Sequence, residues 1–406
     1  MKTEVFIDSI GNTAEIIRKG GLVAVPTETV YGLAANGLDA EAVGKIYEVK
    51  GRPSVKPLSL MVSSCEEMEL YCEEVQPQAL NLAKRFWPGP LTIVLKAKDL
   101  VPDIVLAGGD TLGLRCPDSA LTLQLIREAG LPLAAPSANP SGSKSPQSAA
   151  EILSYFDGAI DAVIDGGACM LGVESTIIDM SSAPYRILRQ GALPEKELKE
   201  ALVDSLTLIG ITGGSGSGKT TALNCLRDFG ALVIDCDELY HRMLLTDIDL
   251  KGELAVRFPE AVGAEGEIDR KALAKTVFGN AEALQDLNGI THKHIADRVR
   301  SILEDYAFSG GRLAALDAVE LISSGLSDHC DHTVAVISDR EGRIERIMSR
   351  DGITREQAER RVDAQKDDAY YVEYCSSVLK NDSSFEDFEN KCRLFFGGLI
   401  HERYEK

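Results

Sequence analysis

A glycine-rich turn near the middle of the chain has the residue types and spacing of a phosphate-binding site. It reads Gly213-Gly-Ser-Gly-Ser-Gly-Lys-Thr220 and fits Gly-x4-Gly-Lys-Thr, the Walker A pattern. In such a turn, backbone N–H groups point at phosphate oxygens, the lysine offsets phosphate charge and the threonine hydroxyl ligates Mg²⁺. The residues predicted to bind ATP with Mg²⁺ are Gly214, Gly216, Ser217, Gly218, Lys219, Thr220 and Thr221, with Thr220 as the metal ligand and Lys219 also catalytic.

Two carboxylates, Asp235 and Asp237, are candidate catalytic groups of the same site. They follow the apolar run 231–234, which predicts a strand. At the carboxyl end of a strand beside a Walker A turn, a carboxylate can take the proton of a substrate hydroxyl or bind water on Mg²⁺. The same residues also suit the N-cap and first turn of a helix, so both interpretations stay open.

A later charged helix supplies candidate cations for this chemistry. Between positions 343 and 350, arginines recur at i, i+3 and i+7 and share one side of the helix. Most charges on such a helix are solvated, and only Arg346 and Arg350 are selected here. Arginines on a closing lid can offset the charge that develops on a transferred phosphoryl group.

The first half of the chain offers other groups. All six histidines lie after the Walker A turn, so chemistry before it must use cations, carboxylates, hydroxyls and backbone. Its predicted loops contain the cations Lys50, Arg52, Lys56 and Arg115 beside the polar residues Thr29, Ser137 and Asn139. Such a set suits a polyanionic nucleotide, and Arg115 can hold a carboxylate in a bidentate manner. Taken singly, each fragment is equally typical of a solvated helix end or a turn.

Alternating helical and strand patterns must position these loops. In the first half, helices are expected at 12–19, 40–48, 66–71, 77–86, 120–129 and 148–156, and strands at 21–25, 57–62, 91–96, 112–115, 132–135, 162–164, 175–179 and 185–188. The mixture predicts an α/β domain with a mixed sheet. In the second half, strands at 206–211, 231–234, 313–316 and 333–337 and a helix at 221–229 predict a parallel sheet. Because a Walker A turn follows the first strand of its domain, the predicted domains are 1–203 and 206–406.

Composition limits the classes of partner. The net charge of −20 disfavours tight binding of nucleic acid or of an anionic membrane. No apolar run approaches the roughly 18 residues of a membrane-spanning helix. Nine scattered cysteines without a C-x-x-C pair, and no recognisable leader, favour reduced thiols and a cytoplasmic location. The segment His329-Cys-Asp-His332 has metal-ligating residue types, but its spacing matches no standard zinc signature.

In this order, the motifs of the first half resemble the threonylcarbamoyl-AMP synthase family, the YrdC-like domain. They are Pro26-Thr-Glu-Thr-Val-Tyr-Gly-Leu33, Lys50-x-Arg52, Ser137-x-Asn139, Gly172-Val-Glu-Ser-Thr-Ile-Ile-Asp179 and Arg189-Gln-Gly191. The resemblance implies synthesis of L-threonylcarbamoyladenylate from L-threonine, bicarbonate and ATP, for the t6A modification of tRNA. It implies that Thr29, Arg115 and Ser175 contact threonine. It also implies that ATP is held by Lys50, Arg52, Lys56, Ser137, Asn139 and Arg189, with Lys50 and Arg52 catalytic.

The second half resembles dephospho-coenzyme A kinase. The motifs are the Walker A turn, Asp235-x-Asp237, Asp269-Arg270, Leu287-x-x-Ile290-x-His292, Arg350-Asp351-Gly352, Ala364-Gln365 and Asn381-Asp382. The resemblance implies a P-loop kinase with a parallel sheet, a helical substrate region and a lid. It implies that the ribose 3′-hydroxyl of dephospho-CoA is phosphorylated, with Asp237, or else Asp235, taking its proton.

Both resemblances include departures. In the first half, Met61 stands where some members have a histidine near threonine. In the second half, the usual Pro-Leu-Leu-x-Glu stretch reads Val319-Glu-Leu-Ile-Ser323, while Asn288 and Lys293 replace an acid and a proline. The acceptor side of the kinase is therefore altered, whereas the Walker A turn and the lid are intact.

The resulting prediction is a cytoplasmic bifunctional enzyme that uses ATP with Mg²⁺ in both halves. Its expected ligands are L-threonine, bicarbonate and dephospho-CoA, its expected partners are downstream tRNA-modification proteins, and no membrane or tight nucleic-acid binding is expected. Two alternatives stay open. The second half could be an ATP-binding regulatory module, because its acceptor side is altered. The first half could be an RNA-binding module with a cationic concave face, although the acidic total charge argues against it.

Overall fold

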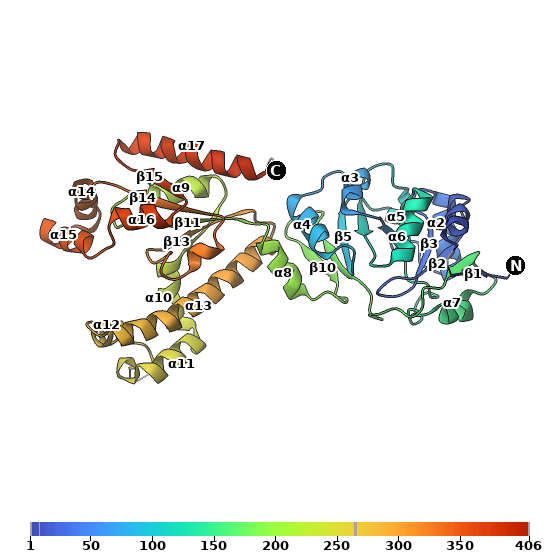
Figure 1. The fold of residues 1–406 in the computed structure, drawn as a ribbon, viewed down its shortest axis with the longest axis horizontal. Helices are drawn as coiled ribbons and strands as arrows, with labels where there is room; N and C mark the ends of the chain where they lie inside the picture. Colours follow the sequence, from blue (N-terminus) through green and yellow to red (C-terminus); the bar gives the residue numbers. More distant parts are fainter. Residues whose placement is uncertain (1, 8, 264–265, 405–406) are drawn as a thin grey trace. The chain divides into compact units, whose positions relative to one another are not determined.

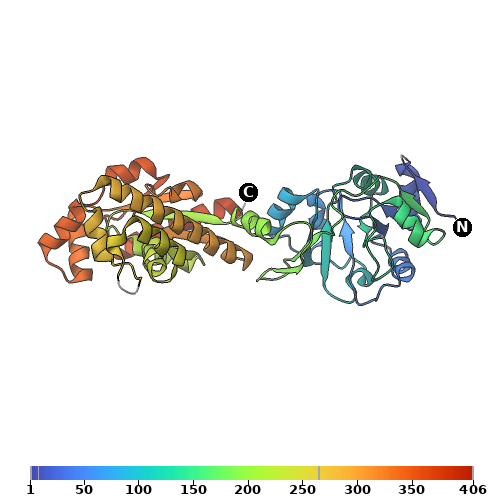
Figure 2. The same cartoon turned by 90° about the horizontal axis from the view of Figure 1, so that it is seen from below.

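The structure is a computed structural model that describes residues 2–7, 9–263 and 266–404. The chain divides into two compact units, one formed by residues up to Ser205 together with Phe308–Gly310 and the other by the rest, and each is described separately (Figures 1 and 2). Within the described residues, no helix combines the length and the apolar character that crossing a membrane requires.

The first unit contains a ten-stranded sheet. Its strand order is β1-β8-β2-β3-β7-β4-β6-β5-β9-β10. The strands are β1 (Glu4–Phe6), β2 (Val23–Val25), β3 (Gly32–Asn36), β4 (Ser59–Met61), β5 (Leu91–Lys96), β6 (Thr111–Arg115), β7 (Leu133–Ala134), β8 (Ala162–Ile164), β9 (Thr176–Asp179) and β10 (Arg186–Arg189). Strand β2 pairs parallel with β8 and antiparallel with β3, while β5 pairs parallel with β9 and antiparallel with β6. The predicted mixed sheet is confirmed.

Helices flank this sheet (Figure 1). They are α1 (Ile10–Arg18), α2 (Ala40–Lys50), α3 (Met68–Tyr71), α4 (Pro77–Phe86), α5 (Asp103–Leu106), α6 (Ala120–Ala129), α7 (Ala149–Phe156) and α8 (Glu195–Val203). One core joins α1, α6 and β2 through buried residues that include Ile17, Leu125 and Val23. Helix α2 starts at the N-cap Asp39, whose side chain accepts from two backbone N–H groups. It stops at Gly51, where φ is 57°, and this left-handed residue directs the cation-bearing loop that follows.

The second unit contains a five-stranded, all-parallel sheet in the order β12-β13-β11-β14-β15. Its strands are β11 (Thr207–Thr212), β12 (Leu232–Asp235), β13 (Leu313–Asp317), β14 (His332–Ile337) and β15 (Ser377–Lys380). The helices are α9 (Lys219–Asp228), α10 (Cys236–Thr246), α11 (Ile248–Arg257), α12 (Arg270–Val277), α13 (Ala281–Phe308), α14 (Arg340–Asp351), α15 (Arg355–Asp363), α16 (Asp368–Tyr374) and α17 (Phe385–Tyr404). Helices α9 and α17 cover the sheet through a core that includes Leu226, Phe388 and Phe396. The predicted parallel sheet is confirmed.

Several elements differ from the sequence prediction. Strands β1 and β3 and helix α5 of the first unit were not predicted, and neither was strand β15 of the second unit. Strand β3 has the sequence Gly-Leu-Ala-Ala-Asn, without β-branched residues, and it is a strand because it pairs with β2 and β7 on either side. Helix α9 begins at Lys219, before the predicted start at 221, because Gly218 with φ 110° ends the phosphate turn directly before it.

Candidate functional sites

The first candidate site is a pocket of ≈ 200 Å³ in the first unit. Strand and helix ends supply its polar lining: Arg52 follows α2, Arg115 ends β6, Ser175 precedes β9 and Arg189 ends β10. Of the residues predicted from the sequence, the pocket is lined by Thr29, Arg52, Arg115, Ser137, Ser175 and Arg189. Segments distant in the sequence therefore meet in one cationic pocket.

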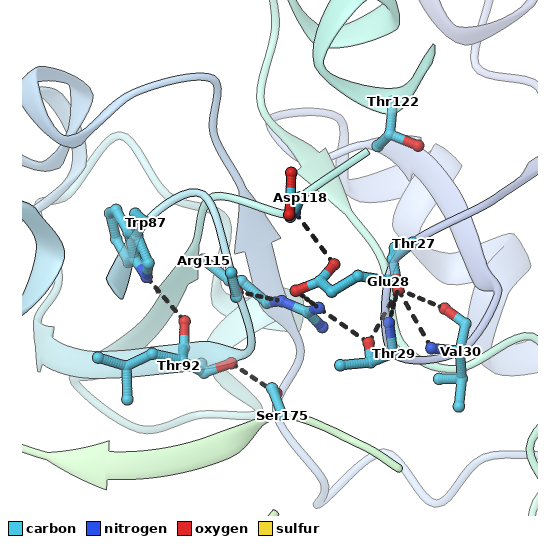
Figure 3. Close-up of polar contacts among 12 residues, drawn as sticks. Thr27, Glu28, Thr29, Val30, Trp87, Thr92, Arg115, Asp118, Thr122 and Ser175 are labelled. Atoms are coloured by element: carbon cyan, nitrogen blue, oxygen red, sulfur yellow. Dashed lines mark hydrogen bonds and ion pairs between the residues drawn. The ribbon is translucent and has the colours of Figure 1, made fainter. Parts of the chain in front are cut away.

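A buried ion pair holds Arg115 at the wall of this pocket (Figure 3). The Arg115 Nη2 donates to Glu28 Oε1 at 2.8 Å, and both side chains are at most 8% exposed. The same Nη2 donates to Thr29 Oγ1 at 2.8 Å, while Nε donates to the Gly89 carbonyl at 3.3 Å. The other Glu28 oxygen accepts from the Asp118 N–H at 3.0 Å. This network fixes the guanidinium from several sides.

The remaining donors of Arg115 suit a carboxylate ligand. Among the described residues, no hydrogen-bond partner is found for its Nη1, which carries two N–H groups. Two hydroxyls of the same pocket, those of Thr92 and Ser175, lie 2.9 Å apart (Figure 3). Glu28 was not assigned a role from the sequence, although its place between two threonines after a buried strand was the available signal.

Lys50 and Asn139, also predicted from the sequence, lie beside the pocket rather than on its lining. The Lys50 ammonium donates to the carbonyls of Ser137 and Asn139, so it supports the loop after β7. Burial, and then the nearby Arg52 charge, lower the pKa of Lys50 to about 8. The amide of Asn139 donates to two loop carbonyls, but its buried Oδ1 has no partner among the described residues. An orphaned acceptor at this depth suits a ligand or water donor.

The remaining predicted cations, Arg52, Lys56 and Arg189, differ in their hydrogen-bond partners and in whether they line the pocket. Arg52 donates to the carbonyls of Lys56 and Pro57, at 3.3 and 2.9 Å. Lys56 itself is exposed and does not line the pocket. Arg189 donates to the Ser175 carbonyl at 3.0 and 2.8 Å and pairs with Glu174 at 2.6 Å. Arg52 and Arg189 are thus held by backbone carbonyls, which pre-orients them for an anion.

The second candidate site is the Walker A turn between β11 and α9. Lys219 Nζ donates to the Gly213 carbonyl at 2.8 Å and so lies across the turn. At the start of α9, the N–H groups of Thr221 and Ala222 bond to the Gly218 carbonyl, whereas no partner is found among the described residues for those of Lys219 and Thr220, which can therefore bind an anion. Ser217 is 1% exposed, and its Oγ has no partner among the described residues. The exposed Thr220 lies in the first turn of α9, where its hydroxyl suits a cation bound with the nucleotide.

Three carboxylates lie at the ends of β12 and β13 and at the start of α10, and two of them, Asp237 and Asp317, favour the charged form of Lys219. Asp235 is the N-cap of α10 and accepts from the Glu238 N–H at 2.9 Å. The Asp237 side chain does not cap the helix. Its pKa is raised, mainly by burial and then by the Asp235 charge, and the Lys219 charge opposes part of this rise. Asp317, at the end of β13, was not predicted because the expected strand stopped one residue earlier. It pairs in register with Asp235, and burial raises its pKa to about 6.

Among the described residues, the predicted lid arginines make no hydrogen bond to the Walker A turn, although the Arg350 charge contributes to lowering the pKa of Lys219. Arg346 bonds to Ser338 and to the Gly342 carbonyl, and Arg350 pairs with Asp351 at 2.7 Å. The arginine that does reach the turn is Arg343, which the sequence interpretation had not selected.

Arg343 is 5% exposed, although it lies on a charged helix. Its Nε donates to the Ser215 carbonyl at 3.0 Å, and its Nη2 donates to Gln365 Oε1 at 2.8 Å. The same Gln365 oxygen accepts from the Ser215 N–H at 2.8 Å. Helix α14 is thereby tied to the phosphate turn through one buried guanidinium.

The altered acceptor side forms a pocket of ≈ 140 Å³ beside Asp237. Its lining includes Tyr240, His292 and Glu320. The hydroxyl of Ser323, where the related stretch has a glutamate, bonds to Glu320. The changed segment therefore still supplies one carboxylate to this pocket, from Glu320 instead of position 323.

The His329–His332 segment has a structural use. Asp331 Oδ2 accepts from the Leu208 N–H at 2.8 Å, beside the parallel pair β11–β14. Across the described part of the chain, no group of three or more His, Cys, Asp or Glu residues could hold a metal ion.

Asp317 allows a test of this electrostatic arrangement. Because its folded pKa of about 6 exceeds the ordinary value of 3.8, the folded chain binds the proton more tightly between these values. Stability is therefore lost as pH rises through that window and stays lower above it. Replacing Asp317 with asparagine is expected to raise the unfolding free energy of the second unit at pH 7.5 by about 1–3 kcal/mol.

Denaturant titrations of wild type and Asp317→Asn at pH 7.5 and 5.5 measure this effect, and the gain should shrink at the lower pH. The exposed Asp328→Asn serves as the charge-matched control. An equal gain in both variants, or none in Asp317→Asn, would contradict the assignment.

Comparisons with known proteins match the two halves separately. A family model described as Telomere recombination matches residues 15–191, and one described as Dephospho-CoA kinase matches residues 207–387. A threonylcarbamoyl-AMP synthase of Pyrococcus abyssi is 48% identical over 189 residues, which cover 47% of this chain and 56% of that protein. A dephospho-CoA kinase of Dehalococcoides mccartyi is 34% identical over 200 residues, which cover 49% of this chain and 99% of the relative.

A putative threonylcarbamoyl-AMP synthase of Methanocaldococcus jannaschii is 40% identical over 183 residues, which cover 45% of this chain and 85% of that protein. The chain spans little more than half the length of the Pyrococcus abyssi synthase that it matches. It spans nearly all of the Dehalococcoides mccartyi kinase.

Proposed function

We propose that this chain is a bifunctional enzyme, because its first half belongs to the threonylcarbamoyl-AMP synthase family and its second half to the dephospho-CoA kinase family. The first half would form L-threonylcarbamoyladenylate from L-threonine, bicarbonate and ATP, for t6A modification of tRNA. The second half would phosphorylate the 3′-hydroxyl of dephospho-CoA with ATP. The single observation that carries the first activity is the oriented Arg115 in a pocket that also holds Arg52 and Arg189.

In the first site, Arg115 would hold the threonine carboxylate through its Nη1 donors, next to the hydroxyls of Thr29 and Ser175. The threonine amine would condense with bicarbonate to form a carbamate, with loss of water. A carbamate oxygen would then attack the α-phosphorus of ATP, and pyrophosphate would leave. Both reactants are anions, so Arg52 and Arg189 would offset their repulsion and the charge on the leaving group. Lys50 would support the loop that presents Ser137 and Asn139 to the nucleotide.

In the second site, Asp237 would take the proton of the acceptor hydroxyl, whose oxygen attacks the γ-phosphorus while ADP leaves. Asp237 suits this role better than Asp235, because the Asp235 carboxylate already caps α10. Lys219 and the backbone N–H groups of the turn would offset the charge on the transferred group. Mg²⁺ arriving with ATP would supply further charge stabilisation, with Thr220 as its protein ligand.

Separate incubations of the full chain test the two activities. With ATP, threonine and bicarbonate, we expect pyrophosphate release that depends on threonine and a product with the mass of threonylcarbamoyl-AMP. With ATP and dephospho-CoA, we expect a product heavier by one phosphoryl group. Absence of either product under these conditions would reject the activity of the corresponding half.

The alternative for the second half is an ATP-binding regulatory module. The changed residues around Glu320 and Ser323 motivate it. ATP binding with slow hydrolysis and no phosphorylated acceptor would favour this alternative. An RNA-binding first half is disfavoured by the net charge of −20, and a strongly salt-dependent affinity for tRNA would favour it.

A cytoplasmic setting also belongs to the proposal. All nine cysteines are free thiols in the structure, as reducing compartments favour. Downstream proteins of tRNA modification are proposed as the users of the first product, because an acyl adenylate of this kind must be passed to an acceptor.

A further inference from the structure

An acidic side chain lies inside the cationic pocket of the first unit. Glu174 lines the pocket, and its Oε2 lies 2.6 Å from Arg189 Nη1. The other carboxylate oxygen accepts from the Ser145 hydroxyl at 3.0 Å. The side chains of Glu174 and Arg189 are 38% and 40% exposed, so the pair faces the pocket rather than the core.

Glu174 acts on more than one cation. It favours the charged forms of Lys50, Arg52 and Arg189, and so opposes the lowering of their pKa values by burial. The two other donor nitrogens of Arg189 are already directed at Ser175, at 2.8 to 3.1 Å. A phosphate that binds Arg189 would therefore have to share its Nη1 group with Glu174 or displace Glu174 from it.

We propose that Glu174 is an internal counter-ion that occupies the cation cluster when no phosphate is bound and competes with anionic ligands for Arg189. The inference rests on the proposed synthase function and extends it. The competing ligand would be the free pyrophosphate that the reaction releases. A carboxylate at this place lowers the affinity of the empty pocket for small phosphates, and so helps the product to leave.

Electrostatic repulsion by Glu174 is expected to weaken the binding of pyrophosphate. Pyrophosphate entering the pocket meets the Glu174 negative charge and must replace an existing ion pair. Partly exposed ion pairs are modest in energy, so the pair can be broken by a polyvalent anion. Removing the carboxylate while keeping its shape is therefore expected to tighten pyrophosphate binding by about five-fold.

Calorimetric titration of the full chain with inorganic pyrophosphate tests the proposal. Every arm carries Lys219→Ala, which weakens pyrophosphate binding at the Walker A turn. Glu174→Gln and Glu174→Ala should both bind more tightly than the parent, and Glu174→Asp, which keeps the charge, should stay close to it. The control is Asp110→Asn, because Asp110 pairs with Lys96 at 3.4 Å on an exposed surface outside the pocket.

The outcomes separate a counter-ion from a structural role. A residue needed only for structure would weaken binding in all three Glu174 variants, and that result would overturn the proposal. Unchanged affinity in Glu174→Gln and Glu174→Ala, or absence of pyrophosphate binding in every arm, would overturn it as well. Threonine-dependent pyrophosphate release by the wild-type chain is measured alongside. If release occurs but the Glu174 variants bind as the parent does, the counter-ion inference fails while the proposed function stands.

Discussion

Replacing Lys219 with alanine is expected to lower kcat/KM for phosphorylation of dephospho-CoA by about 100- to 1,000-fold. Lys219 lies across the Walker A turn, where its ammonium bonds to the Gly213 carbonyl at 2.8 Å. Loss of one pre-oriented charge at a site of developing negative charge has an effect of this order. The positive charge is also matched by Asp317 and Asp237, which favour the protonated form of Lys219 against the lowering of its pKa by burial.

The measurement is formation of the phosphorylated acceptor, followed by mass spectrometry over a range of ATP concentrations. Lys391→Ala is the matched control, because Lys391 lies on α17 and donates to the Lys380 carbonyl, away from the turn. Threonine-dependent pyrophosphate release should be unchanged in both variants. Kinase turnover retained in Lys219→Ala would remove the Walker A turn from the proposed mechanism.

Helices and strands were predictable wherever the hydrophobic periodicity agreed with the residues that typically begin or end such elements. The helices at 77–86 and 120–129 and the strand at 91–96 were predicted with the bounds that the structure shows. Strand β3 was not predicted, because its Gly-Leu-Ala-Ala-Asn sequence has no strand pattern of its own and depends on two neighbours. Local pattern therefore predicts elements, whereas elements that depend on non-local pairing are missed.

The candidate sites were predictable as sets of residues, but not as pairs. Glu28 and Arg115 lie 87 positions apart, and no local signal joins them. The direction of the Lys50 ammonium, toward the carbonyls after β7, depends on how those segments pack. Arg343 could not be distinguished from other arginines of its charged helix, because its burial arises from contact with the Walker A turn. Long motifs thus identify which groups gather, while packing decides which of them face the ligand.

Replacing Glu28 with alanine is expected to give the largest change in the first unit. The variant would leave Arg115 buried without its carboxylate, and breaking one side of a buried ion pair costs about 3–5 kcal/mol. Chemical denaturation should show this loss in the transition of the first unit. Glu15→Ala is the control, because Glu15 pairs with Lys19 at 2.8 Å on the exposed surface, where loss of the pair should change stability far less.

The same ion pair links stability to substrate binding. Glu28→Gln keeps an oxygen for the Arg115 Nη2 but removes the charge, so this variant should be more stable than Glu28→Ala. Without the full pairing, Arg115 is less firmly oriented, and the KM for threonine should rise by about ten-fold or more while the KM for ATP changes little. Threonine-dependent pyrophosphate release at varied threonine and at varied ATP separates these effects. Equal increases in both KM values would show that Glu28 maintains the whole pocket rather than the orientation of Arg115.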